Sequence, residues 1–172
     1  MADPKLAQGG GGGRPSGGPK QIAIVGLALG TGVVLFTAIS LAMPFLEQSG
    51  ASGIDPAAPA EPGGTGSMVG LLSMVHAGFA LVAWTVAMTL SSRLADAARR
   101  ERSADRLRTA YIIKWALMEG VALFGILVVL MAGMEGIVPE QPVYYANLLS
   151  AGVFLAFLAI DISALMSSDA SR

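Results

Sequence analysis

The sequence predicts an all-α membrane protein whose four transmembrane helices form an antiparallel bundle, with both termini in the cytoplasm. The chain contains four apolar runs that are each long enough to cross a bilayer. Hydrophobic residues make up 53% of its 172 residues and charged residues 13%, whereas soluble domains carry about 25% charged residues. The mean hydropathy is +0.63. Every lysine and arginine also lies on one side of the four runs.

The distribution of positive charge predicts the orientation of the chain. Basic residues precede the first run, fill the connection between the second and third runs, begin the third run and end the chain, whereas the other two connections carry only acids. Short cytoplasmic loops carry the excess of Lys and Arg, so both termini and the arginine-rich connection are expected in the cytoplasm. The basic residues are Lys5, Arg14, Lys20, Arg93, Arg99, Arg100, Arg102, Arg106, Arg108, Lys114 and Arg172.

The chain is expected to begin with a disordered cytoplasmic arm over residues 1–20, because a five-glycine run and prolines leave little apolar surface to bury. The transmembrane domain then occupies residues 21–166. Its first span, about 22–43, would rise about 33 Å as a helix, and Pro44 is expected to end it. The run is longer than the core of a secretory signal, about 7–15 residues, although a cleaved signal is the alternative interpretation.

The second span is predicted at about residues 68–90, after an irregular loop rich in Gly, Pro, Ala and Ser over 45–67. Residues 91–110 contain Ala, Arg, Leu and Glu but no Gly or Pro, which favours helix. We therefore expect the second and third spans to continue into the cytoplasm and to meet in a tight turn. Ser91 or Ser103 could cap a helix there.

The third and fourth spans are predicted at about residues 110–134 and 143–166, followed by a cytoplasmic tail over 167–172. Pro139 and Pro142 interrupt the short connection between these two spans. Aromatic residues near the span ends suit the two membrane interfaces. They are Tyr111, Trp115, Tyr144 and Tyr145.

Two of the four ionisable residues within the spans have a structural explanation. A charge in hydrocarbon costs about 2.5–3.5 kcal/mol on insertion scales, so each such residue needs a partner or a role. Lys114 and Asp161 both lie about 7 Å from the cytoplasmic ends of their helices. Because the third and fourth spans are joined by a short turn, they are expected to be neighbours. We therefore predict a structural ion pair between Lys114 and Asp161.

Glu119 is the best candidate for a functional group, because it lies near the middle of the third span with no cation obviously level with it. A carboxyl group desolvated there is expected to be protonated for much of the time near neutral pH. Thr31 lies level with Glu119 in the first span, and His76 lies about one turn farther out in the second. The candidate ion-binding set is therefore Glu119, Thr31 and His76. In the structural alternative, a neutral Glu119 donates to Thr31 or to a main-chain carbonyl.

The first span also carries a candidate helix-packing surface. Gly26 and Gly30 are four residues apart and Gly32 follows, which would let a neighbouring backbone approach closely. Such contacts would serve either folding or the docking of a partner.

Composition and motif content argue against an enzyme, a metal site or a bound cofactor. The chain has no cysteine and one histidine, whereas transition metals favour grouped imidazole or thiolate ligands. No phosphate-binding glycine loop and no serine with a paired base is present. The arginine-rich connection alternates with Asp96, Glu101 and Asp105, so nucleic acid is not an expected partner.

The third span resembles the outer helix of the proton-carrying proteolipid, subunit c, of rotary ATP synthases. The likeness rests on Ala116-Leu-Met-Glu119 with Gly125 and an aliphatic run beyond it, and on an arginine-containing connection before the helix. The resemblance implies that Glu119 is an ion-carrying carboxyl group. It covers about 25 residues, and the second span lacks the proteolipid's repeated small-residue pattern.

The segment from Arg108 to Phe124 more closely resembles that of small four-helix membrane proteins found in several bacterial groups. This likeness implies no particular activity. The expected location of the protein is the bacterial inner (cell) membrane.

Two functional hypotheses follow from these patterns. In the first, the protein carries a proton or a small cation at Glu119. In the second, it is an accessory or assembly subunit of a membrane complex, and Glu119 is neutral and structural. The expected partners are the lipid bilayer together with further copies of the chain or a larger membrane complex.

Overall fold

The computed structural model describes residues 19–48, 65–138 and 141–170, and every regular element in these ranges is helical. The elements are α1 (Pro19–Gln48), α2 (Thr65–Glu101), α3 (Ala104–Met134), the 3-10 helix η1 (Pro142–Leu148) and α4 (Leu149–Ala170). Four helical segments, with η1 and α4 counted together, are long and apolar enough to cross a membrane. The predicted all-helical class and its four potential spans are therefore confirmed.

Several element boundaries differ from those expected. Pro44 does not end the first helix, because α1 continues to Gln48. A proline within a helix removes one main-chain hydrogen bond, here the one that the carbonyl of Ser40 would accept, and the helix ends a turn later. The helix α4 extends through residue 170, so most of the predicted tail is helical. The predicted arm, apart from residues 19 and 20, and most of the predicted 45–67 loop lie outside the described residues.

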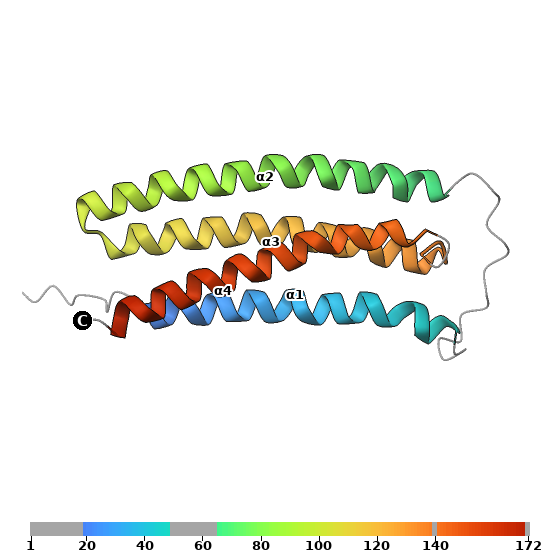
Figure 1. Ribbon diagram of the computed structural model, residues 1–172, viewed down its shortest axis with the longest axis horizontal. Helices are drawn as coiled ribbons and strands as arrows, with labels where there is room; N and C mark the ends of the chain where they lie inside the picture. Colours follow the sequence, from blue (N-terminus) through green and yellow to red (C-terminus); the bar gives the residue numbers. More distant parts are fainter. Residues whose placement is uncertain (1–18, 49–64, 139–140, 171–172) are drawn as a thin grey trace, which may run out of the picture.

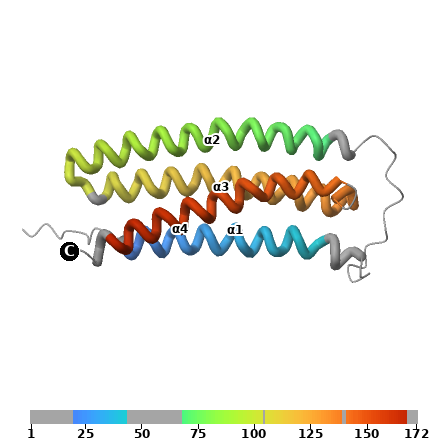
Figure 2. Tube along the Cα trace, in the orientation of Figure 1, coloured from blue at the N-terminus to red at the C-terminus, as the bar shows by residue number. Residues whose placement is uncertain are grey.

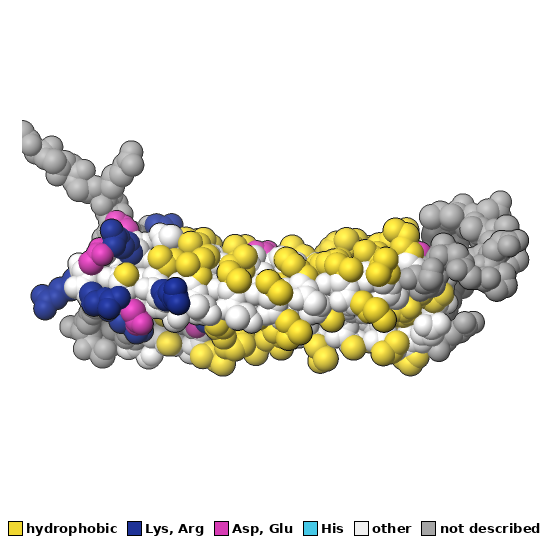
Figure 3. Space-filling model, turned by 90° about the horizontal axis from the view of Figure 1, so that it is seen from above, with side chains coloured by type: hydrophobic (Ala, Val, Ile, Leu, Met, Phe, Trp, Pro, Cys, Tyr) yellow, Lys and Arg dark blue, Asp and Glu magenta, His cyan; other side chains and the backbone are white. Residues whose placement is uncertain are grey.

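The helices lie lengthwise beside one another, and each runs opposite to the one before it (Figure 1). The start of α1, the turn between α2 and α3, and the end of α4 share one end of the molecule. The end of α1, the start of α2, the end of α3 and η1 share the other (Figure 2). Lysine and arginine side chains gather at the first end, whereas apolar side chains cover the middle (Figure 3).

The turn between α2 and α3 is short and capped. Arg102 has a positive φ of 51°, which reverses the chain within two residues. The hydroxyl of Ser103 accepts from the backbone N–H of Arg106, and this contact caps α3. The hydroxyl of Ser91, the other predicted cap, instead donates to the carbonyl of Met88 within α2.

The helix α3 is the centre of the bundle, since it packs against α1, α2, η1 and α4. Its side chains Trp115, Met118 and Ile126 are almost fully buried in the main apolar cluster, together with Phe154 of α4. Trp115 is therefore a core residue and not the interfacial anchor that its position suggested. Its indole reaches across to α1, where it lies against Gly26.

Two of the three candidate packing glycines allow α1 to approach its neighbours. A β-carbon at Gly26 would lie 3.0 Å from both Trp115 and Leu158, and one at Gly30 would lie 2.8 Å from Leu158. No such neighbour lies within 4 Å of Gly32. Gly26 and Gly30 therefore pack inside the bundle, whereas Gly32 faces outward.

Candidate functional site

Glu119 lies at the midpoint of the Asp105–Met134 span and at the edge of an uncovered face of α3. Its side chain is half-buried and makes no hydrogen bond or ion pair with the part of the chain that the structure describes. Successive residues of a helix are rotated by about 100° around its axis. This rotation places Glu119 between the buried stripe of Trp115 and Ile126 and an exposed stripe. We call the exposed stripe, formed by Ala116, Gly120 and Leu127, the open face of α3.

The structure does not bring the predicted ion-binding set together. Thr31 is exposed, and its hydroxyl donates to the carbonyl of Leu27 at 2.8 Å. It lines an apolar groove between α1 and α4, together with Leu155 and Leu158, and it makes no hydrogen bond to Glu119. Thr31 and Glu119 are predicted at the same depth in the membrane, but the side chain of Thr31 does not point toward Glu119.

His76 belongs to a separate polar cluster between α2, α3 and η1. It is 4% exposed, with its Nδ1 atom 2.8 Å from Asn147 Oδ1 and its Nε2 atom 3.1 Å from the carbonyl oxygen of Val121. Its ring also packs edge-on against Phe124. Two neighbouring elements thus supply polar partners for the imidazole, and the histidine is a structural residue of the interior.

Asn147 joins this cluster to the start of α4. Its amide nitrogen donates to Ser73 Oγ and to the carbonyl of Tyr144, both at 2.9 Å. Ser150 donates to the main-chain carbonyl of Asn147 at 2.8 Å. Because a main-chain carbonyl can only accept, the contact with Tyr144 determines the orientation of the amide and directs its oxygen toward His76.

Gly125 gives this cluster the space that it occupies. A β-carbon there would lie 2.3 Å from the carbonyl oxygen of Asn147, 2.6 Å from Ser150 Oγ and 2.8 Å from His76 Cε1. Gly125, which is also part of the proteolipid-like pattern, therefore leaves room for polar residues of α2, η1 and α4 because it has no side chain.

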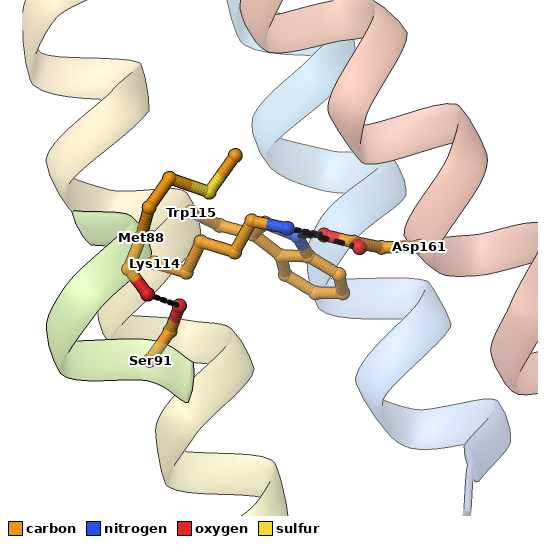
Figure 4. A network of polar contacts seen from close by, with 5 residues as sticks. All are labelled: Met88, Ser91, Lys114, Trp115 and Asp161. Carbon is orange, nitrogen blue, oxygen red and sulfur yellow. Dashed lines mark hydrogen bonds and ion pairs between the residues drawn. The ribbon is translucent and has the colours of Figure 1, made fainter. Parts of the chain in front are cut away.

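Lys114 and Asp161 form a compact ion pair between α3 and α4 (Figure 4). Lys114 Nζ lies 3.0 and 2.8 Å from the two carboxylate oxygens of Asp161. Trp115 Nε1 donates to the same carboxylate at 2.9 Å, and the ammonium lies 5.2 Å from the centroid of Phe157. The carboxylate thus has a counter-ion and an additional donor, which a buried charge requires. A pocket of about 150 Å³ lies beside this pair.

The residues that sequence reasoning missed are uncharged or already assigned to another role. Asn147, Ser73 and Ser150 lie within predicted spans, but they carry no charge and their cost in hydrocarbon is less evident than that of an ionisable residue. An asparagine in an apolar run was the available signal, because its amide also needs partners in hydrocarbon. The contact between Trp115 and Asp161 left no such signal in the sequence.

No group of three or more potential metal-ligating side chains occurs within the described residues. Comparisons of the chain with family models, curated proteins and solved structures gave no match.

Proposed function

We propose that the protein is a non-enzymatic accessory subunit of a bacterial inner-membrane complex, and that it acts as a dimer of its own chain. In this proposal the four helices cross the membrane as an antiparallel bundle, with both termini and the arginine-rich turn in the cytoplasm. The gathering of basic side chains at one end supports this orientation (Figure 3). The four candidate spans support the multi-pass arrangement.

The observation that carries the assembly role is the half-buried Glu119 at mid-span, with no partner in the described chain. A carboxyl group exposed to acyl chains is costly even when neutral, because its O–H and C=O groups lose hydrogen bonds to water. An additional membrane helix over the open face would shield it. The face is accessible to such a helix, since nothing lies within 4 Å of a β-carbon built at Gly120.

A second copy of the chain fits this face. Two copies inserted in the same orientation would be related by a two-fold axis along the membrane normal, so that the open face of one copy meets the open face of the other. Ala116 and Gly120 have the four-residue spacing of small residues that lets membrane helices pack closely. A neutral carboxyl group is both donor and acceptor, so two Glu119 side chains can satisfy one another.

Proton or cation carriage at Glu119 has less support. Carriage through the membrane requires polar groups on both sides of the carboxyl group. Thr31 bonds within its own helix and His76 bonds to Asn147 and Val121, so neither candidate relay group contacts Glu119.

Disulfide cross-linking tests the dimer directly, because the natural chain has no cysteine. A Gly120→Cys variant oxidised in native membranes is expected to yield a covalent dimer. Leu81→Cys is the matched control, since Leu81 is 69% exposed and lies at a similar depth on α2, away from the open face. Equal cross-linking at the two positions, or none at Gly120→Cys, would contradict the proposal.

Vesicle measurements separate assembly from ion carriage. Reconstituted protein is expected to give no proton flux above that of protein-free vesicles. In the Gly120→Cys background, Glu119→Gln should retain cross-linking, because an amide can also pair with itself, whereas Glu119→Leu should lose it. Proton flux that Glu119→Gln abolishes would instead support the carrier hypothesis.

A further inference from the structure

The pocket beside the Lys114–Asp161 pair has the composition of a polar ligand site. It lies over α3, between α2 and α4, at the arginine-rich end of the molecule. Its volume is about 150 Å³. The polar residues that line it are Ser91, Ser92, Tyr111, Lys114 and Asp161.

Two donors in this pocket retain hydrogen-bonding capacity. A lysine ammonium has three N–H donors, of which two are accounted for by the oxygens of Asp161. The hydroxyl of Tyr111 makes no hydrogen bond with the described residues, although its ring packs on Trp115 at a centroid distance of 5.7 Å. Lys114 and Asp161 offset one another's charge, and Trp115 also donates to the carboxylate. The pair therefore offers an anion a hydrogen-bond donor but no net charge.

A guanidinium group lies close to the same pocket. Asp161 and Arg99 both act electrostatically on Tyr111, Asp161 more strongly than Arg99. Arg99 lies on α2, one to two turns beyond Ser92 and Ala95. Its pairing with Asp96 is 3.4 Å long and exposed, with side chains 71% and 61% accessible, so it contributes little and leaves Arg99 available for another partner.

The depth of the pocket matches the polar region of a bilayer. Tyr111 and Lys114 lie about 10–15 Å along α3 from its first residue, at 1.5 Å per residue. This segment is the boundary between the charged turn and the apolar part of the span. Basic pockets between membrane helices at this level bind anionic lipid head groups. Here Lys114 and Asp161 form a neutral pair in the lining, so the net positive charge would come from Arg99 beside it.

We propose that this pocket binds the phosphate group of an anionic phospholipid, with Arg99, Tyr111 and Lys114 as its donors. The hydroxyls of Ser91 and Ser92 donate to main-chain carbonyls, so their lone pairs can accept from head-group hydroxyls. Phosphatidylglycerol matches both groups of residues, because its phosphodiester can accept from the three donors and its head-group hydroxyls can donate to the two serines. The proposal requires that the helices cross a membrane, but it does not depend on the dimer.

Native mass spectrometry of the full chain in detergent tests the site. Phosphatidylglycerol is expected to bind about tenfold more tightly than phosphatidylcholine. Tyr111→Phe and Arg99→Gln should each weaken binding of phosphatidylglycerol about tenfold, the effect of losing one hydrogen bond to a charged group. Arg93→Gln is the matched control, because it removes the same charge from α2 but lies about 100–160° around the helix from Ser91, Ser92 and Ala95.

Three outcomes would overturn the proposal. Equal loss of binding in Arg93→Gln and Arg99→Gln would show a diffuse electrostatic effect of the turn. Equal affinity for the two lipids would show that no anion site exists. Stabilisation by inorganic phosphate alone, with the same dependence on Tyr111 and Arg99, would identify a site for free phosphate instead of a head group. Because Tyr111→Phe keeps the aromatic ring, loss of folding should not obscure these results.

Discussion

At the scale of single residues, the polar groups inside this bundle differ in how completely they are satisfied. Asp161 receives donors from Lys114 and Trp115, and His76 has a polar partner at each ring nitrogen. Glu119 has none in the described chain. Because unsatisfied polar groups in hydrocarbon are costly, this contrast supports the proposal that Glu119 interacts with a group outside the monomer.

The Lys114–Asp161 pair predicts a strong non-additive effect on stability. Its side chains are 11% and 13% exposed, and removing one partner of a buried pair costs about 3–5 kcal/mol. Asp161→Leu should therefore destabilise the protein by roughly that amount. The double variant with Lys114→Met should recover part of the loss, because no buried charge is then left alone, although the indole N–H of Trp115 still lacks its acceptor.

A double-mutant cycle in mixed micelles, followed by denaturant unfolding, measures this coupling. If the losses in the free energy of unfolding of the two single variants simply add in the double variant, the ion pair contributes little beyond its apolar contacts.

Gly125 predicts a second effect at a single residue. Gly125→Ala would force a methyl group against the carbonyl of Asn147 and the His76 ring, and overpacking of this kind costs about 1–3 kcal/mol. Gly152→Ala is the control, because no neighbour lies within 4 Å of its added carbon and alanine favours helix. Thermal unfolding should thus separate the two variants, and equal melting temperatures would contradict the packing described here.

At the scale of the elements, η1 holds the start of the fourth segment against the rest of the bundle. Pro142 begins this 3-10 helix, where its missing N–H removes no helical hydrogen bond. Asn147 then connects η1 to Ser73 and His76 of α2. Polar side chains thus join two segments that are not adjacent in the sequence.

Asn147→Leu should loosen this junction locally. The amide makes contacts with Ser73, His76 and the carbonyl of Tyr144, and leucine can replace none of them. Hydrogen exchange is expected to accelerate in η1 and the first turn of α4 but not around the Lys114–Asp161 pair. Ser167→Ala serves as the control, because that hydroxyl bonds only within α4. Unchanged exchange in η1 would show that apolar packing alone holds the segment.

The sequence predicted the elements better than it predicted their contacts. Apolar run lengths identify spans because a helix must cross a fixed thickness of hydrocarbon. Depth from a helix end also placed Lys114 level with Asp161, whose atoms lie 2.8 Å apart. Depth does not specify direction around the helix axis. Depth alone therefore groups Thr31 with Glu119, although Thr31 lines the groove between α1 and α4.

At the scale of the whole molecule, the basic residues at one end predict how the bundle inserts. Single cysteines can report which end of the bundle is accessible from outside the cell. Val143 is exposed at the start of η1, and Arg100 is exposed near the α2–α3 turn. A membrane-impermeant maleimide added to intact cells should label Val143→Cys, and it should label Arg100→Cys only after the inner membrane is permeabilised. The reverse pattern would contradict the proposed orientation.

The open face of α3 is a feature of the whole molecule that packing within the monomer does not explain. Ala116, Gly120 and Leu127 form it, Glu119 borders it, and no other helix of the described chain covers it. Self-association would shield the carboxyl group and would cost little conformational entropy, since both surfaces are already ordered.

Fluorescence energy transfer between differently labelled copies in liposomes tests this association most directly. Added lipid dilutes the protein within the membrane. Energy transfer between copies of the natural chain should persist at dilutions where random proximity no longer produces transfer. Transfer in Glu119→Leu should fall to the random level. If the natural chain and Glu119→Leu lose transfer at the same dilution, a second copy does not cover Glu119, and the proposed dimer is wrong.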